Sequence, residues 1–195
     1  MRHLAVSRYY WFSGRMSAEF NVRLHTHFTG KPMIVDLVRK DERESLLALA
    51  VHTSLFTAED AEALLGVVLD ALASGELPDG HSAVACRESP RGPTAGWAYF
   101  APDQYAENVW NVWWIGICPD RHGTGAAQIL LSHVEQTALA SGARVIVIET
   151  SDQDAMARAR SFYVKVGYTE RGRIPDFYAE GESKVLFSRS FASAA

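Results

Sequence analysis

The residues best suited to chemistry lie in a glycine-rich segment, PDRHGTGAA, at residues 119–127. An apolar run, VWWIGI at residues 112–117, precedes it and an amphipathic run follows it, which predicts a strand, a turn and a helix. Glycines permit a tight turn from which several backbone N–H groups point outward, and the helix N-terminus adds partial positive charge there. The pattern predicts a binding site for an anionic, phosphate-bearing cofactor. The alternative is a connection that simply needs positive φ at Gly123 and Gly125.

Two nucleotide-binding patterns fit this turn poorly. A Walker-type loop requires Gly-Lys-Ser/Thr, and no lysine lies between Lys40 and Lys165. A dinucleotide fingerprint requires a third glycine, whereas the segment here reads G-T-G-A-A-Q, although Glu149 lies near the spacing of the acidic residue that such a site needs. A dinucleotide-dependent oxidoreductase is therefore the poorer match.

The composition indicates one globular domain with a substantial core. The chain has 195 residues, of which 48% are hydrophobic and 22% charged, and its net charge is −4. This charge provides no basic surface for nucleic acid, and no apolar run reaches the roughly eighteen residues of a membrane span. The two cysteines, Cys86 and Cys118, are too few for a disulfide framework, so we expect a reducing, cytoplasmic environment.

The first thirty residues differ from the rest. They mix arginines and aromatic residues without a clear period and lack the apolar stretch of a secretory signal. We expect an N-terminal extension of uncertain order at 1–30 and a single domain at 31–195; the chain start at Met16 is an open alternative. His25 and His27 lack a third ligand, so we expect surface residues and no metal.

Periodicity and turn residues predict the elements of the domain. One helix should begin near Asp41 and a second at a capping box at Thr57. A third should follow Gly125, and a fourth should cover residues 154–166. The strand at 109–117, the helix and the strand at 144–149 should form a parallel β-α-β unit. The predicted strands are 33–38, 81–86, 95–100, 109–117, 144–149 and an edge or exit strand at 184–189.

Two motifs, together with this order of elements, resemble the GNAT superfamily of N-acetyltransferases. The motifs are P-x-x-x-G-x-G-x-[GA] at residues 119–127 and F-Y-x-x-x-G-[FY] at residues 162–168, and the resemblance spans 33–189. The tail, RIPDFYAEGESKVLF at residues 173–187, resembles a bacterial branch of that superfamily with no one acceptor. The resemblance implies a mixed α/β fold with a mostly antiparallel central sheet, splayed between its fourth and fifth strands, and helices on both faces. It implies acetyl-CoA as co-substrate, bound in that gap, and no metal.

The resemblance also assigns the cofactor contacts. Main-chain groups of the fourth strand would bind the pantetheine, at Ile115, Gly116 and Ile117. Amides of the turn would bind the pyrophosphate, at His122, Gly123, Thr124, Gly125, Ala126 and Ala127. Two positions depart from the family pattern. In the turn, His122 stands where the family usually has Arg or Gln, and Arg121 lies one position before it. In the helix after the strand at 144–149, the asparagine that is often found near the cofactor is replaced around Met156. Arg158 and Arg160 are the candidates to compensate, with Arg158 as the expected cofactor contact; the alternative is that both are solvated surface residues.

Acetyl transfer to an amine needs two proton movements, because the ammonium loses a proton and the departing thiolate gains one. Glu149, at the end of a buried strand, is the candidate base; its alternatives are a cap of the next helix or an ion pair with Arg144. Tyr163 falls on the tyrosine of the second motif and is the candidate acid, although periodicity alone would make it a core residue. The sequence supplies no base to activate Cys118, so direct attack by the amine in a ternary complex is expected.

The acceptor is expected to be a primary amine of a small molecule, amino acid or peptide. The loop 174–181 is expected to act as a lid, and Asn111 stands where related chains often carry an acid. The sequence leaves open the formation of a homodimer. A non-catalytic acyl-CoA sensor of the same fold is the main alternative, and Glu149 and Tyr163 argue against it. The candidate pocket residues are Trp110, Trp113, Trp114, Asp176, Phe177 and Tyr178.

Overall fold

The computed structural model describes residues 33–191. The expectations for residues 1–30, among them those on Met16, His25 and His27, lie outside the described residues. Within 33–191, no helix has the length and apolar character needed to cross a membrane.

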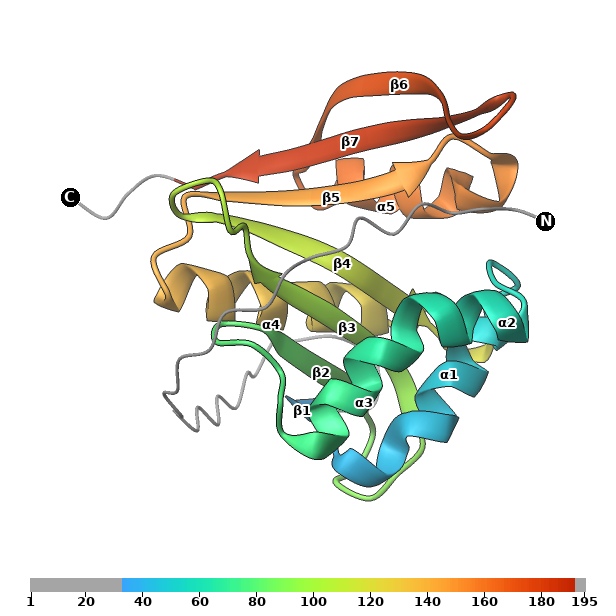
Figure 1. Ribbon diagram of the computed structural model, residues 1–195, viewed down its shortest axis with the longest axis vertical. Helices are drawn as coiled ribbons and strands as arrows, with labels where there is room; N and C mark the ends of the chain where they lie inside the picture. The colour runs from blue at the N-terminus through green and yellow to red at the C-terminus, as the bar shows by residue number, and fades with distance from the viewer. Residues whose placement is uncertain (1–32, 192–195) are drawn as a thin grey trace. The chain divides into compact units, whose positions relative to one another are not determined.

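The described strands are joined by hydrogen bonds in the order β1-β2-β3-β4-β5-β7-β6 (Figure 1). Neighbouring strands are antiparallel in the pairs β1–β2, β2–β3, β5–β7 and β6–β7, whereas β4 and β5 are parallel. The mixed α/β class and the mostly antiparallel sheet predicted from the resemblance are therefore confirmed. The strands are β1 (Ile34–Leu37), β2 (Ser82–Arg87), β3 (Thr94–Pro102), β4 (Val109–Ile117), β5 (Val145–Ser151), β6 (Thr169–Ala179) and β7 (Glu182–Ser190).

The parallel strands β4 and β5 pair along only part of their length. Val109–Val112 lie opposite Val145–Ile148, and the register contains only these four pairs. Both strands continue, β4 to Ile117 and β5 to Ser151. An early end of pairing between the fourth and fifth strands is what the sequence resemblance implied.

The described chain divides into two compact units. The N-terminal unit consists of residues 33–100 and 114–134, and the C-terminal unit of residues 101–113 and 135–191. Strand β4 and helix α4 (Ala126–Ala140) each contribute residues to both units.

Helices of the N-terminal unit form where capping residues favour them. Thr57 accepts a hydrogen bond from the Asp60 amide in a capping box, and Gly75 ends the helical segment at φ +78°, as predicted. Trp97 of β3 is fully buried beneath these helices, where its indole N–H donates to the carbonyl oxygen of Leu46 at 3.2 Å. The helices are α1 (Arg43–His52), α2 (Ala58–Ala61) and α3 (Val67–Ser74), with one π-helical stretch at Glu62–Gly66.

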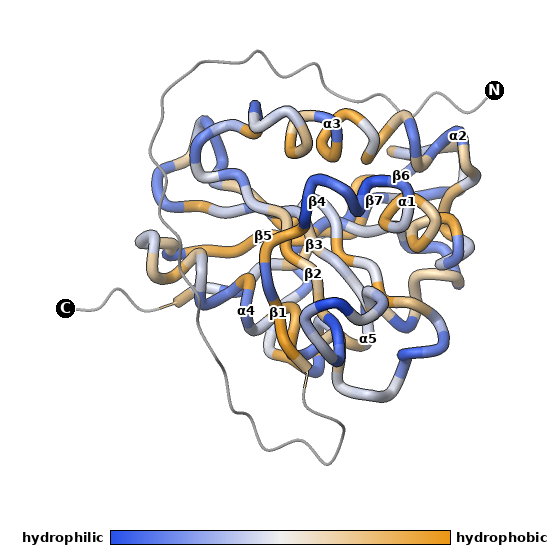
Figure 2. Tube along the Cα trace, turned by 90° about the horizontal axis from the view of Figure 1, so that it is seen from below, coloured by the Kyte–Doolittle hydropathy of each residue, from blue (hydrophilic) through white to orange (hydrophobic). Residues whose placement is uncertain are grey.

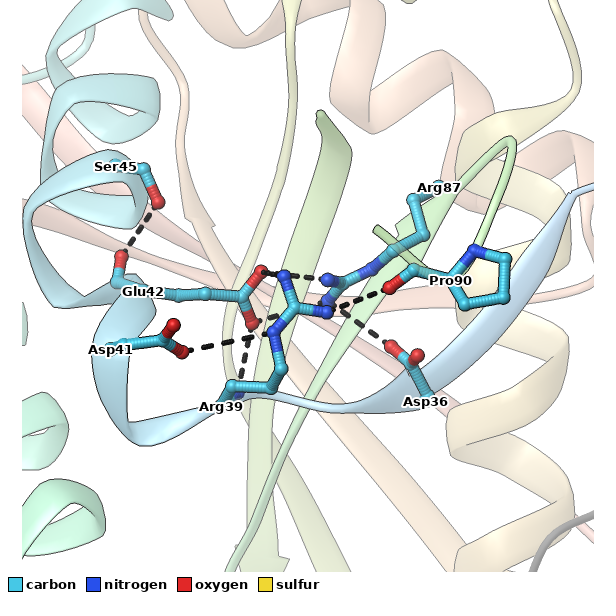
Figure 3. Close-up of polar contacts among 7 residues, drawn as sticks. All are labelled: Asp36, Arg39, Asp41, Glu42, Ser45, Arg87 and Pro90. Carbon is cyan, nitrogen blue, oxygen red and sulfur yellow. Dashed lines mark hydrogen bonds and ion pairs between the residues drawn. The ribbon is translucent and has the colours of Figure 1, made fainter. Parts of the chain in front are cut away.

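A buried ionic network fastens the start of this unit to β2 (Figure 3). Arg87 is 0% exposed, and its guanidinium donates to both carboxylate oxygens of Glu42, at 2.7 and 3.2 Å. The same guanidinium lies 3.1 Å from Asp36, and Arg39 donates to Glu42 at 2.7 Å. Arg87 and Glu42 thus compensate each other's buried charge, while Asp36 and Arg39 extend the network toward solvent.

The C-terminal unit is built on β5, whose apolar run Val145–Ile148 is coloured as hydrophobic in Figure 2. Ile146 and Ile148 are buried together with Val185 and Phe187 of β7. Helix α5 (Ala157–Lys165) follows a single 3-10 turn and stops before Gly167, whose φ is +95°. Glycine is favoured there because other residues rarely adopt positive φ.

Strand β6 was not predicted, and this corrects two expectations. Strand β6 pairs with β7 as far as Ile174 and again at Ala179, so the expected lid loop at 174–181 belongs to a bulged hairpin, and β7 lies between β5 and β6 rather than at an edge. The sequence of β6 is mostly exposed and carries Pro175, so it shows no alternation of buried and exposed residues. Proline is tolerated in edge strands because they have unpaired backbone groups.

Candidate functional site

The glycine turn has the backbone conformation that its composition suggested. Gly123 has φ +79° and Gly125 has φ +89°. A Cβ atom added at Gly123 would meet nothing within 4 Å, so the backbone conformation, and not crowding, favours glycine there. The turn leads directly into α4 at Ala126.

Several amides of the turn remain available for a ligand. The amide of His122 donates to Pro119 and that of Thr124 to Arg121, which closes the turn internally. Within residues 33–191, the amides of Gly123, Gly125, Ala126 and Ala127 donate to no other backbone group. Because these four groups precede or begin a helix of 15 residues, they form a favourable environment for an anion.

The end of β4 offers main-chain groups beside this turn. The Cys118 amide donates to Ala95 of β3 at 2.8 Å, and a Cβ atom added at Gly96 would come within 2.7 Å of the Gly116 carbonyl oxygen. The β3 side of β4 is therefore closely packed. The pairing with β5 ends at Val112, so Ile115, Gly116 and Ile117 take no part in it.

Two of the candidate arginines, Arg121 and Arg160, have contacts that serve the local structure. Arg121 forms an ion pair with Glu88. Arg160 donates to the carbonyl oxygens of Ser151 and Gln153, at 2.7 and 2.8 Å, and so holds the connection between β5 and α5. Arg158 is exposed on α5 in the C-terminal unit, and its contact with the cofactor stays a prediction.

Glu149 pairs with a residue that the sequence did not single out. Its carboxylate lies 2.6 Å from Lys184 Nζ, whereas Arg144, the expected partner, donates from Nε to the Glu107 carbonyl oxygen. The side chain of Lys184 is only 13% exposed, and that of Glu149 is 34% exposed. In the antiparallel register of β5 and β7, Ser151 lies opposite Lys184, and Glu149, two residues earlier on the same face, is therefore a diagonal neighbour of Lys184. This register would have identified the pair once both strands were known.

Two aromatic rings complete the surroundings of Lys184. Its Nζ lies 3.7 Å from the centre of the Phe177 ring and 5.7 Å from that of Tyr178. Burial, and then the nearby carboxylates of Glu149 and Glu182, raises the pKa of Tyr178 to about 12. We call Glu149, Phe177, Tyr178 and Lys184 the lysine cluster.

Tyr163 is 5% exposed and lies among other aromatic rings. Its ring centre is 5.5 Å from that of Phe187, and Phe162 and Tyr168 are its other ring neighbours. Burial raises the pKa of Tyr163 above its ordinary value, so the phenol stays protonated at neutral pH and retains a proton to donate. The position agrees with the core residue that periodicity alone predicted, and the role as acid stays a prediction.

The residues expected to line the acceptor pocket belong to both units, Trp114 to the N-terminal unit and the others to the C-terminal unit. Trp110 is buried, and Trp114 packs against Phe56 and Trp97 in the core of the N-terminal unit. Asp176 accepts a hydrogen bond from the Gly181 amide and thus holds the turn between β6 and β7. Only Phe177 and Tyr178, of the residues expected in this pocket, belong to the lysine cluster.

A carboxylate does lie beside Asn111, where related chains often carry an acid. The Asn111 amide donates to Asp103 at 2.9 Å. Asp103 is a further candidate that sequence reasoning missed, because it follows β3 and only the fold brings it to β4.

Both cysteines are free thiols. Cys86 is fully buried, as expected of a core residue, and burial raises the pKa of its thiol to about 12. Cys118 Sγ lies 3.9 Å from His52 Nδ1, a neighbour that the sequence did not reveal. Within residues 33–191, no group of three or more His, Cys, Asp or Glu residues is placed to bind a metal.

Comparisons with known proteins relate this chain and its fold to one family. The family model of the acetyltransferase (GNAT) family matches residues 37–168. No curated protein matches the chain.

Solved structures resemble the fold over most of the chain. A protein assigned to the GNAT family from Desulfovibrio desulfuricans is 24% identical, with 83% of this chain and 99% of that one covered and a TM-score of 0.73. The ribosomal-protein-S18-alanine N-acetyltransferase from Escherichia coli is 14% identical, with coverages of 84% and 97% and a TM-score of 0.64. The yncA protein of Salmonella typhimurium, solved with its cofactor acetyl-CoA, is 18% identical, with coverages of 84% and 96% and a TM-score of 0.62. The chain therefore belongs to the GNAT family of acetyltransferases and is an acyltransferase.

Proposed function

We propose that the protein is an N-acetyltransferase that moves the acetyl group of acetyl-CoA to a primary amine by direct attack in a ternary complex. The observation that carries the proposal is the glycine turn, whose amides at Gly123, Gly125, Ala126 and Ala127 donate to no backbone group within residues 33–191 and stand at the start of α4. Two adjacent phosphates suit several convergent amides better than they suit one side chain.

The donor would bind along the end of β4 and the turn. The pantetheine would pair with main-chain groups of Ile115–Ile117, and the pyrophosphate with the amides of residues 122–127. Arg158 would add a charged contact. The yncA structure, which holds acetyl-CoA on a similar fold, supports this placement by analogy. With Cys86 and Cys118 as free thiols, the proposal includes a reducing, cytoplasmic location.

Glu149 would accept the proton of the acceptor ammonium, directly or through water. The amine nitrogen then attacks the thioester carbonyl, the C–S bond breaks, and coenzyme A leaves with a proton from the Tyr163 phenol. The acylated nitrogen gives its second proton to the resulting Tyr163 phenolate, directly or through water, so the phenol is restored. Burial keeps Tyr163 protonated at neutral pH, which is the state that its part as the acid requires. The partial exposure of Glu149 supports access of the acceptor to its carboxylate.

The test is incubation of the full chain with acetyl-CoA and a panel of amines, amino acids and peptides, with free thiol and acetylated product measured together. We expect equal amounts of both. Glu149→Gln should lower kcat/KM by about 10²–10⁴, the usual value of general-base assistance. Glu180→Gln, which removes an exposed carboxylate from the turn between β6 and β7, is the matched control.

Each other outcome contradicts a defined part of the proposal. If calorimetric titration with CoA shows no heat of binding, the proposed donor site is wrong. Binding of acetyl-CoA without product would favour the non-catalytic sensor, and a nicotinamide-linked absorbance change would favour an oxidoreductase. Labelled acetyl found on Cys118 would replace direct attack by a covalent route in which His52 is the neighbouring base.

A further inference from the structure

The lysine cluster is an ammonium-binding site that the chain's own lysine occupies. Lys184 Nζ lies 2.6 Å from Glu149 Oε2 and 3.7 Å from the centre of the Phe177 ring. A carboxylate and an aromatic face both attract an ammonium ion, and more strongly where water is partly excluded. The site therefore already provides the surroundings that an acceptor ammonium needs, at the carboxylate proposed as the base.

An irregularity in strand β6 brings Phe177 to Lys184. Ile174 of β6 lies opposite Lys184, but the next pair is Ala179 with Glu182, so residues 175–178 leave the ladder and carry Phe177 to the ammonium. The bulge is held by Asp176, which has φ +53° and accepts a hydrogen bond from the Gly181 amide. Bulges in edge strands commonly redirect a side chain in this way.

This arrangement disfavours an acceptor that carries an ammonium group but no carboxylate. If its ammonium took the place of Lys184 at Glu149, the lysine would lose its carboxylate while 13% exposed and would face a second positive charge. An unpaired, largely buried charge is costly, and such a cost discriminates between ligands. An acceptor that brings its own carboxylate avoids this cost, because Lys184 regains a partner.

We propose that the acceptor is a zwitterion, a free α-amino acid or a close analogue, whose ammonium binds Glu149 and whose carboxylate binds Lys184. This inference rests on the proposed function and names its substrate class. Because the two protein charges are adjacent, the charges of the ligand must be adjacent too, which selects α-amino carboxylates over polyamines and over the amino termini of peptides. The half-exposed Phe177 ring offers an apolar face to the remainder of the acceptor.

The experiment compares acceptors that differ only in the carboxylate. Wild type and Lys184→Met are assayed with the twenty amino acids and with the decarboxylated amines of leucine, methionine and phenylalanine. We expect the wild type to prefer each reactive amino acid over its amine at least tenfold in kcat/KM. Lys184→Met should abolish this preference, mainly by raising KM for the amino acid, and Lys184→Arg should retain most of it. Lys165→Met, which removes an exposed lysine from α5, should change nothing.

Equal use of amino acids and amines by the wild type would overturn the inference, and this measurement needs no variant. An unchanged preference in a folded Lys184→Met variant would do the same. If no acceptor is acetylated, the proposed function fails, and calorimetric titration with the twenty amino acids then decides the inference separately. Binding that Lys184→Met weakens at least tenfold supports it, and no binding of any amino acid by the wild type rejects it.

Discussion

Among single residues, Tyr163 shows how burial selects a protonation state. The side chain lies among Phe162, Tyr168 and Phe187, and desolvation raises the pKa of its phenol. A neutral phenol is a hydrogen-bond donor and a proton source, whereas a phenolate would be neither. The same burial that makes the residue look structural therefore keeps it in the state that an acid requires.

We predict that Tyr163→Phe retains acetyl-CoA binding and lowers kcat at least tenfold, because only the ionisable hydroxyl is removed. Since the pKa is raised, loss of the Tyr163 proton should not produce an alkaline fall in activity below about pH 10, the ordinary pKa of tyrosine. Calorimetry with CoA and the pH dependence of kcat measure both points. Tyr105→Phe, at an 88% exposed tyrosine, is the control. Unchanged turnover in Tyr163→Phe would remove the residue from the mechanism.

Among the elements, the turn before α4 depends on its backbone conformation. Gly123→Ala places a Cβ in open space but at φ +79°, where non-glycine residues are strained by about 1–2 kcal/mol. We predict at least a tenfold loss of affinity for CoA, because the turn relaxes and the amides of Gly123 and Gly125 turn away from the phosphates.

A matched variant separates this effect from general strain. Gly181 has φ +75° and also has nothing within 4 Å of an added Cβ, but it lies in the turn between β6 and β7. Gly181→Ala should lower the free energy of unfolding by a similar amount and leave CoA affinity unchanged. Equal losses of affinity in both variants would show that the turn has no special part in binding.

Some elements can be predicted from the sequence and others cannot, for physical reasons. Strand β4 was predicted with its observed bounds because its residues, apart from Asn111, form a long apolar run. Strand β6 was missed because its residues are exposed and include Pro175. The pair of Glu149 and Lys184 was missed because ion pairs across strands depend on register, which the sequence alone does not specify.

At the scale of the whole molecule, we expect stability to depend on the ionic network around Arg87 and Glu42 in the N-terminal unit (Figure 3). We predict that Arg87→Met lowers the free energy of unfolding by about 3–5 kcal/mol, because Glu42 keeps its buried charge after losing both hydrogen bonds from Arg87. The double variant Arg87→Met with Glu42→Met should recover much of this loss, since it leaves no buried charge between the two positions.

Denaturant unfolding measures these changes. Arg173→Met provides the comparison, because it breaks an exposed ion pair with Glu170, and such pairs contribute less than about 1 kcal/mol. A loss in Arg87→Met no larger than that in Arg173→Met would contradict the structural role of the network.

Asp36 gives the network a dependence on pH. Burial is the largest influence on this carboxyl group and raises its pKa, although Arg87 and Arg39 act in the opposite direction. A raised pKa in the folded state means that Asp36 contributes most to stability below its unfolded pKa, near 3.8, and that this contribution is lost as the pH rises through the folded pKa. Because asparagine cannot ionise, a protein with asparagine at position 36 does not lose this stability as the pH rises. We therefore predict that Asp36→Asn gains stability relative to wild type as the pH rises from acidic to neutral values.

Denaturant unfolding of both proteins between pH 4 and pH 7 tests this prediction, with Asp79→Asn, at an exposed aspartate, as the control. The difference in unfolding free energy should increase for Asp36→Asn until the pH passes the folded pKa of Asp36, and the increase should exceed any change seen with Asp79→Asn. A difference that falls with rising pH would mean that the attraction of Arg87 and Arg39 exceeds the cost of burial. The ionised form of Asp36 would then stabilise the start of the N-terminal unit, and the network would need all of its charges.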